Sequence, residues 1–85
     1  EYDLAIHYLR ESIRIDPVSP DARLALGSAW IQNGKFEAAV PELERAVQLD
    51  PHMSRAYFLL ARAYQTLGRK EDAATALKKA QQGQE

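Results

Sequence analysis

Asp50, His52 and Ser54 bring the three residue types of a serine-hydrolase triad into one short stretch of chain. In such a triad, the histidine takes a proton from the serine and the carboxylate orients the histidine. Triad groups converge on a pocket from separate elements, whereas these three residues belong to a single predicted connection. We therefore interpret them as part of a helix connection and expect that the protein is not an enzyme.

Two other sets of residues invite comparison with ligand-binding motifs. Gly34-Lys35-Phe36 places a lysine after a glycine, but no serine or threonine follows the lysine, and Gly27 lies within a predicted helix. The pattern therefore fits a helix stop better than a phosphate-binding loop. His7 and His52 are far apart and have no partners at ligand spacing, so we predict no metal site and no cofactor.

Composition and charge narrow the classes of function. The formal net charge is -1, which argues against a nucleic-acid partner and against a membrane partner. No apolar run is long enough to span a membrane, and the hydrophobic content of 46% excludes disorder as the main state. The lack of cysteine fits a reducing compartment such as the cytoplasm. The sequence begins with Glu1-Tyr2, without a methionine, so we expect a fragment of a longer protein.

A repetition with a 34-residue period organises the elements that position these side chains. Identical residue types recur at this spacing along the chain. The recurring pairs include Ala22 and Ala56, Leu26 and Leu60, Ala29 and Ala63, Gly34 and Gly68, Ala39 and Ala73, Leu43 and Leu77, and Ala46 and Ala80. A fixed period of this length is typical of stacked repeats, in which each unit buries its apolar face on its neighbours.

The spacing of apolar residues predicts five helices joined by short turns. Their expected ranges are 2–15, 20–33, 36–49, 54–67 and 70–82. Asp16-Pro17 and Asp50-Pro51 end two of them, and Gly34 is expected to take the left-handed conformation after another. Pro41 lies inside the third range, where it removes a backbone donor, so we expect a kink or a frayed first turn.

Short turns make successive helices antiparallel, and small residues are expected where two helices approach closely. We expect Gly27 to lie opposite Ala39, and Ala61 to lie opposite Ala73. Large side chains, among them Trp30, fill the space between these points. This alternation is the packing typical of a helical array.

Two copies of one pattern resemble the tetratricopeptide repeat. The first copy is Leu26-Gly27, Trp30, Gly34, Ala39, Leu43, Ala46 and Asp50-Pro51, and the second is Leu60-Ala61, Tyr64, Gly68, Ala73, Leu77 and Ala80. The resemblance implies an all-α fold, a right-handed superhelical array of antiparallel helix pairs. It divides residues 1–85 into the second half of a repeat (1–19) and two full repeats (20–53 and 54–85). Departures from the pattern are Ser12, Arg23, Leu43 and Leu77, where an alanine or an aromatic residue is usual.

The resemblance also implies a protein–protein interaction module that holds a partner peptide or helix in a concave groove. The first helix of each pair lines that groove. The expected partner-binding residues are Leu24, Ser28, Ile31, Arg55, Phe58, Arg62 and Gln65. An apolar patch flanked by Arg55 and Arg62 suits a partner with an acidic residue. The lysine and asparagine that grip a C-terminal carboxylate in one subset of the family are missing, so that activity is not expected here.

One alternative to a binding groove stays open at this point. In that alternative the groove side chains meet the next helix pair, and the chain is a structural or self-assembling spacer without a dedicated ligand. RNA recognition by related 35-residue helical repeats is disfavoured, because the period here is 34 and the net charge is slightly negative.

Both terminal helices are expected to expose apolar surface, and hence to favour a homo-oligomer. Leu4, Ile6, Leu9 and Ile13 form a stripe wide enough for two neighbours. At the other end, Leu77 and the alanine row Ala73, Ala76 and Ala80 have no polar capping helix. Exposed apolar surface of this kind seldom stays in water, so we expect association between copies.

Overall fold

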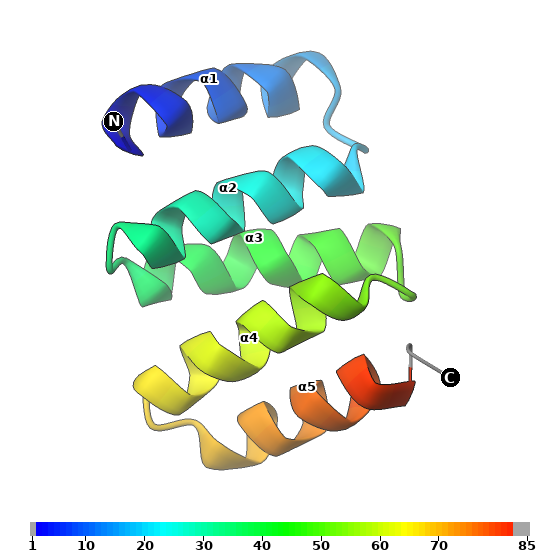
Figure 1. The fold of residues 1–85 in the computed structure, drawn as a ribbon. Coiled ribbons are helices and arrows are strands. Elements are labelled where there is room, and N and C mark those ends of the chain that lie inside the picture. The colour runs from blue at the N-terminus through cyan, green and yellow to red at the C-terminus, as the bar shows by residue number, and fades with distance from the viewer. Residues whose placement is uncertain (1, 83–85) are drawn as a thin grey trace.

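The computed structural model describes residues 2–82, which form five α-helices and no strand. The helices are α1 (Tyr2–Ile15), α2 (Pro20–Gln32), α3 (Phe36–Leu49), α4 (Ser54–Thr66) and α5 (Lys70–Gln82). Each helix runs antiparallel to the next, and the series stacks from α1 at one end to α5 at the other (Figure 1). The predicted all-α array is confirmed, and only the ends of α2 and α4 fall one residue earlier than expected.

The turns between helices use the residues that the sequence marks as stops. Gly34 and Gly68 have φ angles of 77° and 81°, the left-handed conformation that a side chain disfavours. The Gly34 N–H donates to the carbonyl of Ile31 at 2.9 Å, which satisfies a carbonyl left free at the end of α2. At the start of α2, Ser19 Oγ accepts a hydrogen bond from the N–H of Ala22 at 3.2 Å.

We predict that Gly34→Val lowers the free energy of unfolding by about 1–2 kcal/mol, because a β-branched residue is strained at positive φ. No atom lies within 4 Å of a Cβ built at Gly34, so the loss comes from the backbone and not from crowding. Gly34→Asn is the control, since asparagine tolerates this conformation and should cost less. Chemical denaturation measures both; equal losses for the two variants would contradict the conformational explanation.

Pro41 lies inside α3 without ending it. The helix is continuous from Phe36 to Leu49, and the N–H of Ala39 donates to the carbonyl of Lys35 at 3.1 Å. The expectation of a frayed first turn is therefore wrong, and the alternative expectation, a kink at Pro41, stays a prediction. Proline cannot donate to the carbonyl of Glu37, but both residues are exposed, so water can satisfy that oxygen.

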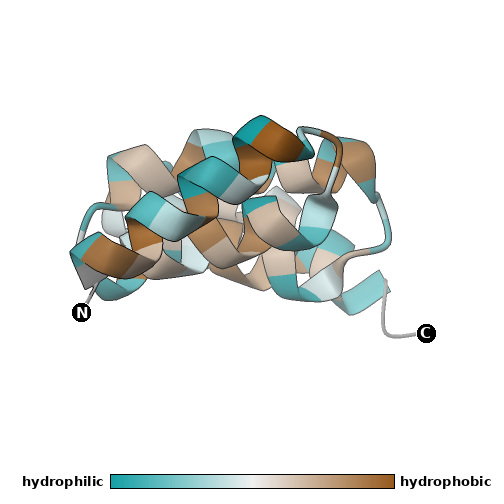
Figure 2. Ribbon diagram, turned by 90° about the horizontal axis from the view of Figure 1, so that it is seen from above, coloured by the Kyte–Doolittle hydropathy of each residue, from teal (hydrophilic) through white to brown (hydrophobic). Residues whose placement is uncertain are grey.

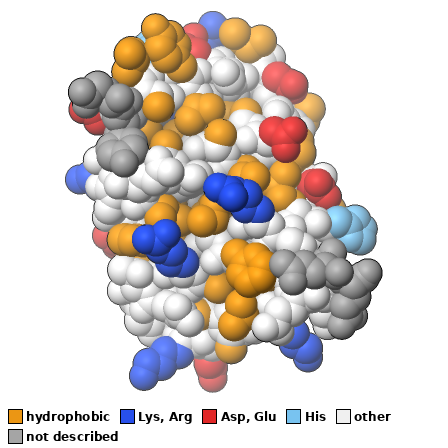
Figure 3. Space-filling model, viewed as in Figure 1, with side chains coloured by type: hydrophobic (Ala, Val, Ile, Leu, Met, Phe, Trp, Pro, Cys, Tyr) orange, Lys and Arg blue, Asp and Glu red, His pale blue; other side chains and the backbone are white. Residues whose placement is uncertain are grey.

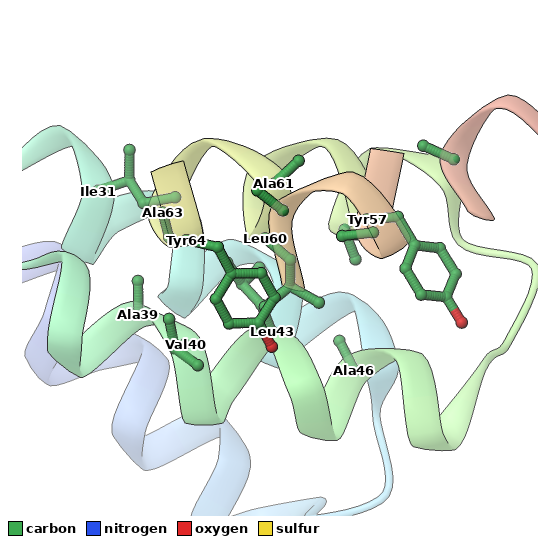
Figure 4. Close-up of a cluster of buried hydrophobic side chains, with 14 residues drawn as sticks. Ile31, Ala39, Val40, Leu43, Ala46, Tyr57, Leu60, Ala61, Ala63 and Tyr64 are labelled. Atoms are coloured by element: carbon green, nitrogen blue, oxygen red, sulfur yellow. The ribbon is translucent and has the colours of Figure 1, made fainter. Parts of the chain in front are cut away.

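The main hydrophobic core lies between α3, α4 and α5 and reaches the end of α2 (Figure 4). Leu43 is its largest fully buried side chain, with 0% of its surface exposed. A second, smaller cluster joins α1 to α2 through Ile6, Leu26 and Ala29. Trp30 packs against both clusters and so links the α1–α2 cluster to the main core.

Gly27 marks the close approach of α2 and α3. A Cβ at this position would lie 2.5 Å from both Cγ and Cδ2 of Leu43, far inside van der Waals contact. The expected pairing of Gly27 with Ala39 is thus corrected, because the side chain that needs the space is Leu43. The larger leucine fills the gap that the missing Cβ leaves.

The expected apolar surface at the C-terminal end is also corrected. Ala73, Ala76 and Ala80 are buried, because their row on α5 packs against α4. The exposed residues of α5 are mostly polar and include Lys78 and Gln81. At the N-terminal end Ile6 is buried against α2, and the large apolar side chains that α1 exposes include Leu4, Tyr8 and Ile15. Figure 2 shows hydrophobic bands along α1, seen from that end of the molecule.

Candidate partner-binding groove

The first helices of the two pairs, α2 and α4, lie side by side, and α3 packs against both of them (Figure 1). Their outward residues lie 34 positions apart in sequence, so Leu24 is equivalent to Phe58 and Ser28 to Arg62. We call the surface that carries these residues, together with Arg55 and Gln65, the α2–α4 groove. It contains six of the seven expected partner-binding residues.

A hollow of about 430 Å³ lies at the α1 side of this groove. Leu24 and Ser28 are half-buried and line it. Its full lining is Ala5, Leu9, Asp21, Leu24, Ala25, Ser28, Ala29, Gln32 and Arg55. The hollow therefore combines an apolar floor with a few polar side chains, the composition that binds an apolar side chain or a helix face.

A second hollow of about 370 Å³ lies on α4, lined by Ser54, Arg55, Phe58 and Leu59. Arg55 lines both hollows and so stands between them. Phe58 is 38% exposed, which is unusual for a large aromatic side chain on a helix that packs against three others. The arrangement places an exposed aromatic ring beside a guanidinium on one stripe of α4.

Arg55 and Arg62 are exposed and form no ion pair within residues 2–82. By contrast, Arg23 Nη1 lies 3.0 Å from Glu42 Oε1, and Arg69 Nη2 lies 2.9 Å from Asp72 Oδ2. Figure 3 shows basic side chains over the middle of this face with hydrophobic side chains around them. The two groove arginines are therefore available to a carboxylate of a partner.

The remaining expected residues divide between surface and core. Arg62 and Gln65 are exposed and lie on the same stripe of α4 as Phe58, although they line neither hollow. Ile31 is only 4% exposed and belongs to the main core. Its expected role in partner binding is corrected, because α4 lies against the end of α2 and covers this side chain.

Sequence reasoning missed much of the lining of the first hollow. Asp21, Ala25 and Gln32 come from α2, and Ala5 and Leu9 come from α1. The 34-residue repeat could have identified two of these residues. Asp21 lies 34 positions before Arg55, and Ala25 lies 34 positions before Leu59, so each occupies the position in its repeat of a residue that lines the second hollow. No signal in α1 marks Ala5 and Leu9 as groove residues, since their exposure depends on what packs against α1.

Two contacts at equivalent positions of the repeat join each first helix to the helix that precedes it in the chain. One contact joins α2 to α1, and the other joins α4 to α3. The Arg10 guanidinium carbon lies 5.3 Å from the ring centroid of Trp30, and the Tyr64 hydroxyl donates to Glu44 Oε2 at 2.5 Å. Arg10 and Glu44 occupy equivalent positions of the repeat, as do Trp30 and Tyr64. Burial of Tyr64, and then its hydrogen bond to Glu44, raise the pKa of the phenol above its ordinary value. Tyr64 thus remains a donor even at alkaline pH, where an ordinary phenol loses its proton.

Of the residues first compared with catalytic and metal motifs, Asp50 and His52 lie in the connection between α3 and α4, Ser54 begins α4, and His7 lies in α1. Asp50 Oδ1 accepts a hydrogen bond from the backbone N–H of His52 at 3.1 Å, a local contact that shapes the turn before α4. Within the described part of the chain, no three His, Asp or Glu side chains gather to hold a metal ion. None of the described helices is long and apolar enough to cross a membrane.

Solved structures similar to this chain include several of MamA. The structure titled "MamA MSR-1 C2" is 30% identical with a TM-score of 0.90, and covers 98% of this chain and 48% of its own. "Crystal structure of MamA" is 28% identical with a TM-score of 0.93 and the same coverage of 98% and 48%. This chain thus spans about half the length of those MamA chains.

A more distant structure is titled "Second TPR of Spaghetti (RPAP3) bound to HSP90 peptide SRMEEVD". It is 23% identical with a TM-score of 0.90, covers 93% of this chain and 73% of its own, and shows a shared fold alone. No curated protein sequence matches this chain. Two family models, each described as "Tetratricopeptide repeat", match residues 31–84 and residues 1–51. The helix pairs, the 34-residue register and these matches agree, and the chain belongs to the tetratricopeptide repeat family.

Proposed function

We propose that this chain is a protein–protein interaction module that binds a partner peptide or helix in the α2–α4 groove. Tetratricopeptide repeats generally mediate interactions between proteins, which supports the class of function. The observation that carries the proposal is the position of Arg55 between two hollows, next to the exposed ring of Phe58. A concave apolar surface with a few polar groups suits a peptide side chain or helix face.

The partner that fits best carries apolar side chains and an acidic residue. Its apolar side chains enter the two hollows, and its carboxylate lies near Arg55 or Arg62. Fully burying one apolar side chain of the partner in a hollow contributes about 1.5–3 kcal/mol, whereas an exposed ion pair contributes about 0.2–1 kcal/mol. The apolar contacts therefore supply most of the affinity, and the arginines supply the preference for an acid and faster association.

The test uses a peptide selected for binding to this chain from an unbiased random library. We expect selected peptides to contain both apolar and acidic residues. Reversing two charges with Arg55→Glu and Arg62→Glu together should weaken binding about tenfold and flatten its salt dependence. Titration calorimetry at two salt concentrations measures both quantities.

The matched control reverses two charges outside the groove, with Lys70→Glu and Lys78→Glu, both on exposed residues of α5. This variant should change binding by less than about twofold, since the charges lie away from the bound carboxylate. Equal losses in the two double variants would indicate general electrostatic attraction and contradict a groove site. A second copy of the chain filling the groove would instead support the alternative, a structural or self-assembling array.

A further inference from the structure

A small hollow lies between α3, α4 and α5, outside the α2–α4 groove. It measures about 150 Å³, enough for the end of one side chain. Its polar lining residues are Glu44 from α3, Tyr57 and Tyr64 from α4, and Asp72, Thr75 and Lys79 from α5. Among residues 2–82, it shares no lining residue with the two hollows of the groove. Three successive helices form its walls, so its shape is set within residues 44–79.

Two tyrosine rings form one wall of this hollow. Tyr57 and Tyr64 lie about two turns apart on α4 with Leu60 between them, so the three side chains occupy one face of the helix (Figure 4). The tyrosines are 9% and 7% exposed, so the packed helices hold both rings in place. Lys79 Nζ lies 5.8 Å from the ring centroid of Tyr57. The Arg69 guanidinium carbon lies 4.6 Å from that of Tyr64. Both rings therefore already attract cations of the chain itself.

Two carboxylates complete the polar lining. Glu44 Oε2 accepts a hydrogen bond from the Tyr64 hydroxyl, and Asp72 Oδ2 pairs with Arg69. Within residues 2–82, the second oxygen of each carboxylate and the Tyr57 hydroxyl form no hydrogen bond with another protein group. The hollow therefore offers three free oxygen acceptors beside an aromatic face.

The preceding repeat shows how a guanidinium occupies the equivalent place. Arg10 lies 34 positions before Glu44, and Trp30 lies 34 positions before Tyr64. The Arg10 guanidinium carbon lies 5.3 Å from the ring centroid of Trp30. The second repeat thus carries an acid where the first carries a cation. Two lining carboxylates face one lining ammonium, that of Lys79, among the described residues, so charge complementarity favours a further cation in the hollow.

We propose that this hollow binds the guanidinium of an arginine side chain presented by a partner protein. The guanidinium lies on the ring of Tyr57 in place of the Lys79 ammonium, which turns into solvent because Lys79 is exposed. Its N–H groups donate to the free oxygens of Glu44 and Asp72. Arginine fits better than lysine, because its planar group stacks on a ring and donates in several directions within that plane. The proposal goes beyond peptide binding in the α2–α4 groove and rests on different side chains.

The test titrates N-acetyl-arginine amide into the isotope-labelled chain and follows its NMR signals. The signals of Tyr57, Asp72 and Thr75 should shift and saturate, with a dissociation constant of about 1–10 mM for so small a probe. N-acetyl-citrulline amide is the matched probe, since it has nearly the same shape without the charge. It should bind at least about fivefold more weakly, because it loses both the attraction to the carboxylates and the attraction to the ring.

Three substitutions in the chain give the second arm of the test. Glu44→Gln removes a charge but keeps an acceptor for the Tyr64 hydroxyl, and it should weaken binding of the arginine probe about threefold. Lys79→Gln removes the competing cation and should strengthen binding about threefold. Lys78→Gln is the matched control, because it removes the same charge from an exposed residue that does not line the hollow. It should change binding by less than about 1.5-fold.

Three results would overturn the proposal. Shifts that stay linear up to about 50 mM probe, or equal binding of the arginine and citrulline probes, would show that the hollow does not select a guanidinium. Equal effects of Lys79→Gln and Lys78→Gln would indicate general attraction to the surface. Self-association of the chain that is lost with Glu44→Gln would assign the hollow to an arginine of a second copy. The groove is tested separately, because Glu44→Gln should leave the acidic groove peptide bound and Arg55→Glu should leave the arginine probe bound.

Discussion

Leu43→Ala should lower the free energy of unfolding by about 2–5 kcal/mol. The side chain is fully buried, and it fills the space that Gly27 leaves between α2 and α3. Truncation removes apolar contacts and leaves a cavity where both helices are fixed by their other contacts. Domains of this kind have a total stability of about 5–15 kcal/mol, so the variant should be close to unfolded at moderate temperature. Urea denaturation followed by helical circular dichroism measures the loss.

Leu9→Ala is the matched control, since Leu9 occupies the equivalent position on α1. Leu9 is half-buried and lines the open hollow, so its truncation should cost less than half as much. Both variants remove the same atoms, and only the burial differs. Similar losses for the two variants would contradict the unequal packing of the two equivalent helices.

Trp30→Ala should cost about 3 kcal/mol and should release α1 before the other helices. Trp30 packs against both hydrophobic clusters, and the guanidinium of Arg10 lies over its ring. In a stacked array, stability is roughly a sum of contacts between neighbours, so losing one interface frees the element beyond it. Hydrogen exchange should speed up most at the amides of α1, and least in α4 and α5.

The control for this prediction is Trp30→Phe, which keeps a large apolar ring between the two clusters. It should retain most of the slow exchange in α1, because burial and not the indole N–H carries the contact. Uniform acceleration of exchange in all helices of Trp30→Ala would show that the array unfolds as a single unit. That outcome would contradict the separate role assigned to the α1–α2 cluster.

The sequence predicts the helices and their order well, because the relevant signals are local. Gly34 and Gly68 take positive φ angles, and Ser19 caps α2, at the positions where sequence patterns place a stop and a start. Each of these residues acts on the backbone within one turn of itself. The return of the same signals in the next repeat also predicts that successive units stack in the same way.

Contacts between helices are less predictable, because they depend on three-dimensional spacing. The sequence pattern places Gly27 opposite Ala39, yet the nearest side chain is Leu43, and only the packed helices reveal which residue fills the gap. The link between Tyr64 and Glu44 pairs residues on different helices, and no local pattern marks it. Pro41 lies within a continuous helix although proline is unfavourable inside one.

The candidate site is predictable in part. Arg55 and Phe58 lie beside the hollows, as expected from their place on the outward face of a first helix. The same pattern places Ile31 in the groove, but Ile31 is buried, because its exposure depends on the position of α4 and not on its own helix. Contrary to the expectation, the alanine row of α5 is also buried, because α4 packs against it. Burial is decided by neighbouring helices, which a helical pattern does not identify.

The most direct test of the proposed function is NMR mapping of the selected acidic peptide on the uniformly labelled chain. We predict the largest amide shifts at Leu24, Ser28, Arg55, Phe58 and Arg62, with intermolecular contacts from a peptide apolar side chain to the ring of Phe58. Shifts confined to α3 and α5, with the signals of Arg55 and Phe58 unchanged, would contradict binding in the α2–α4 groove.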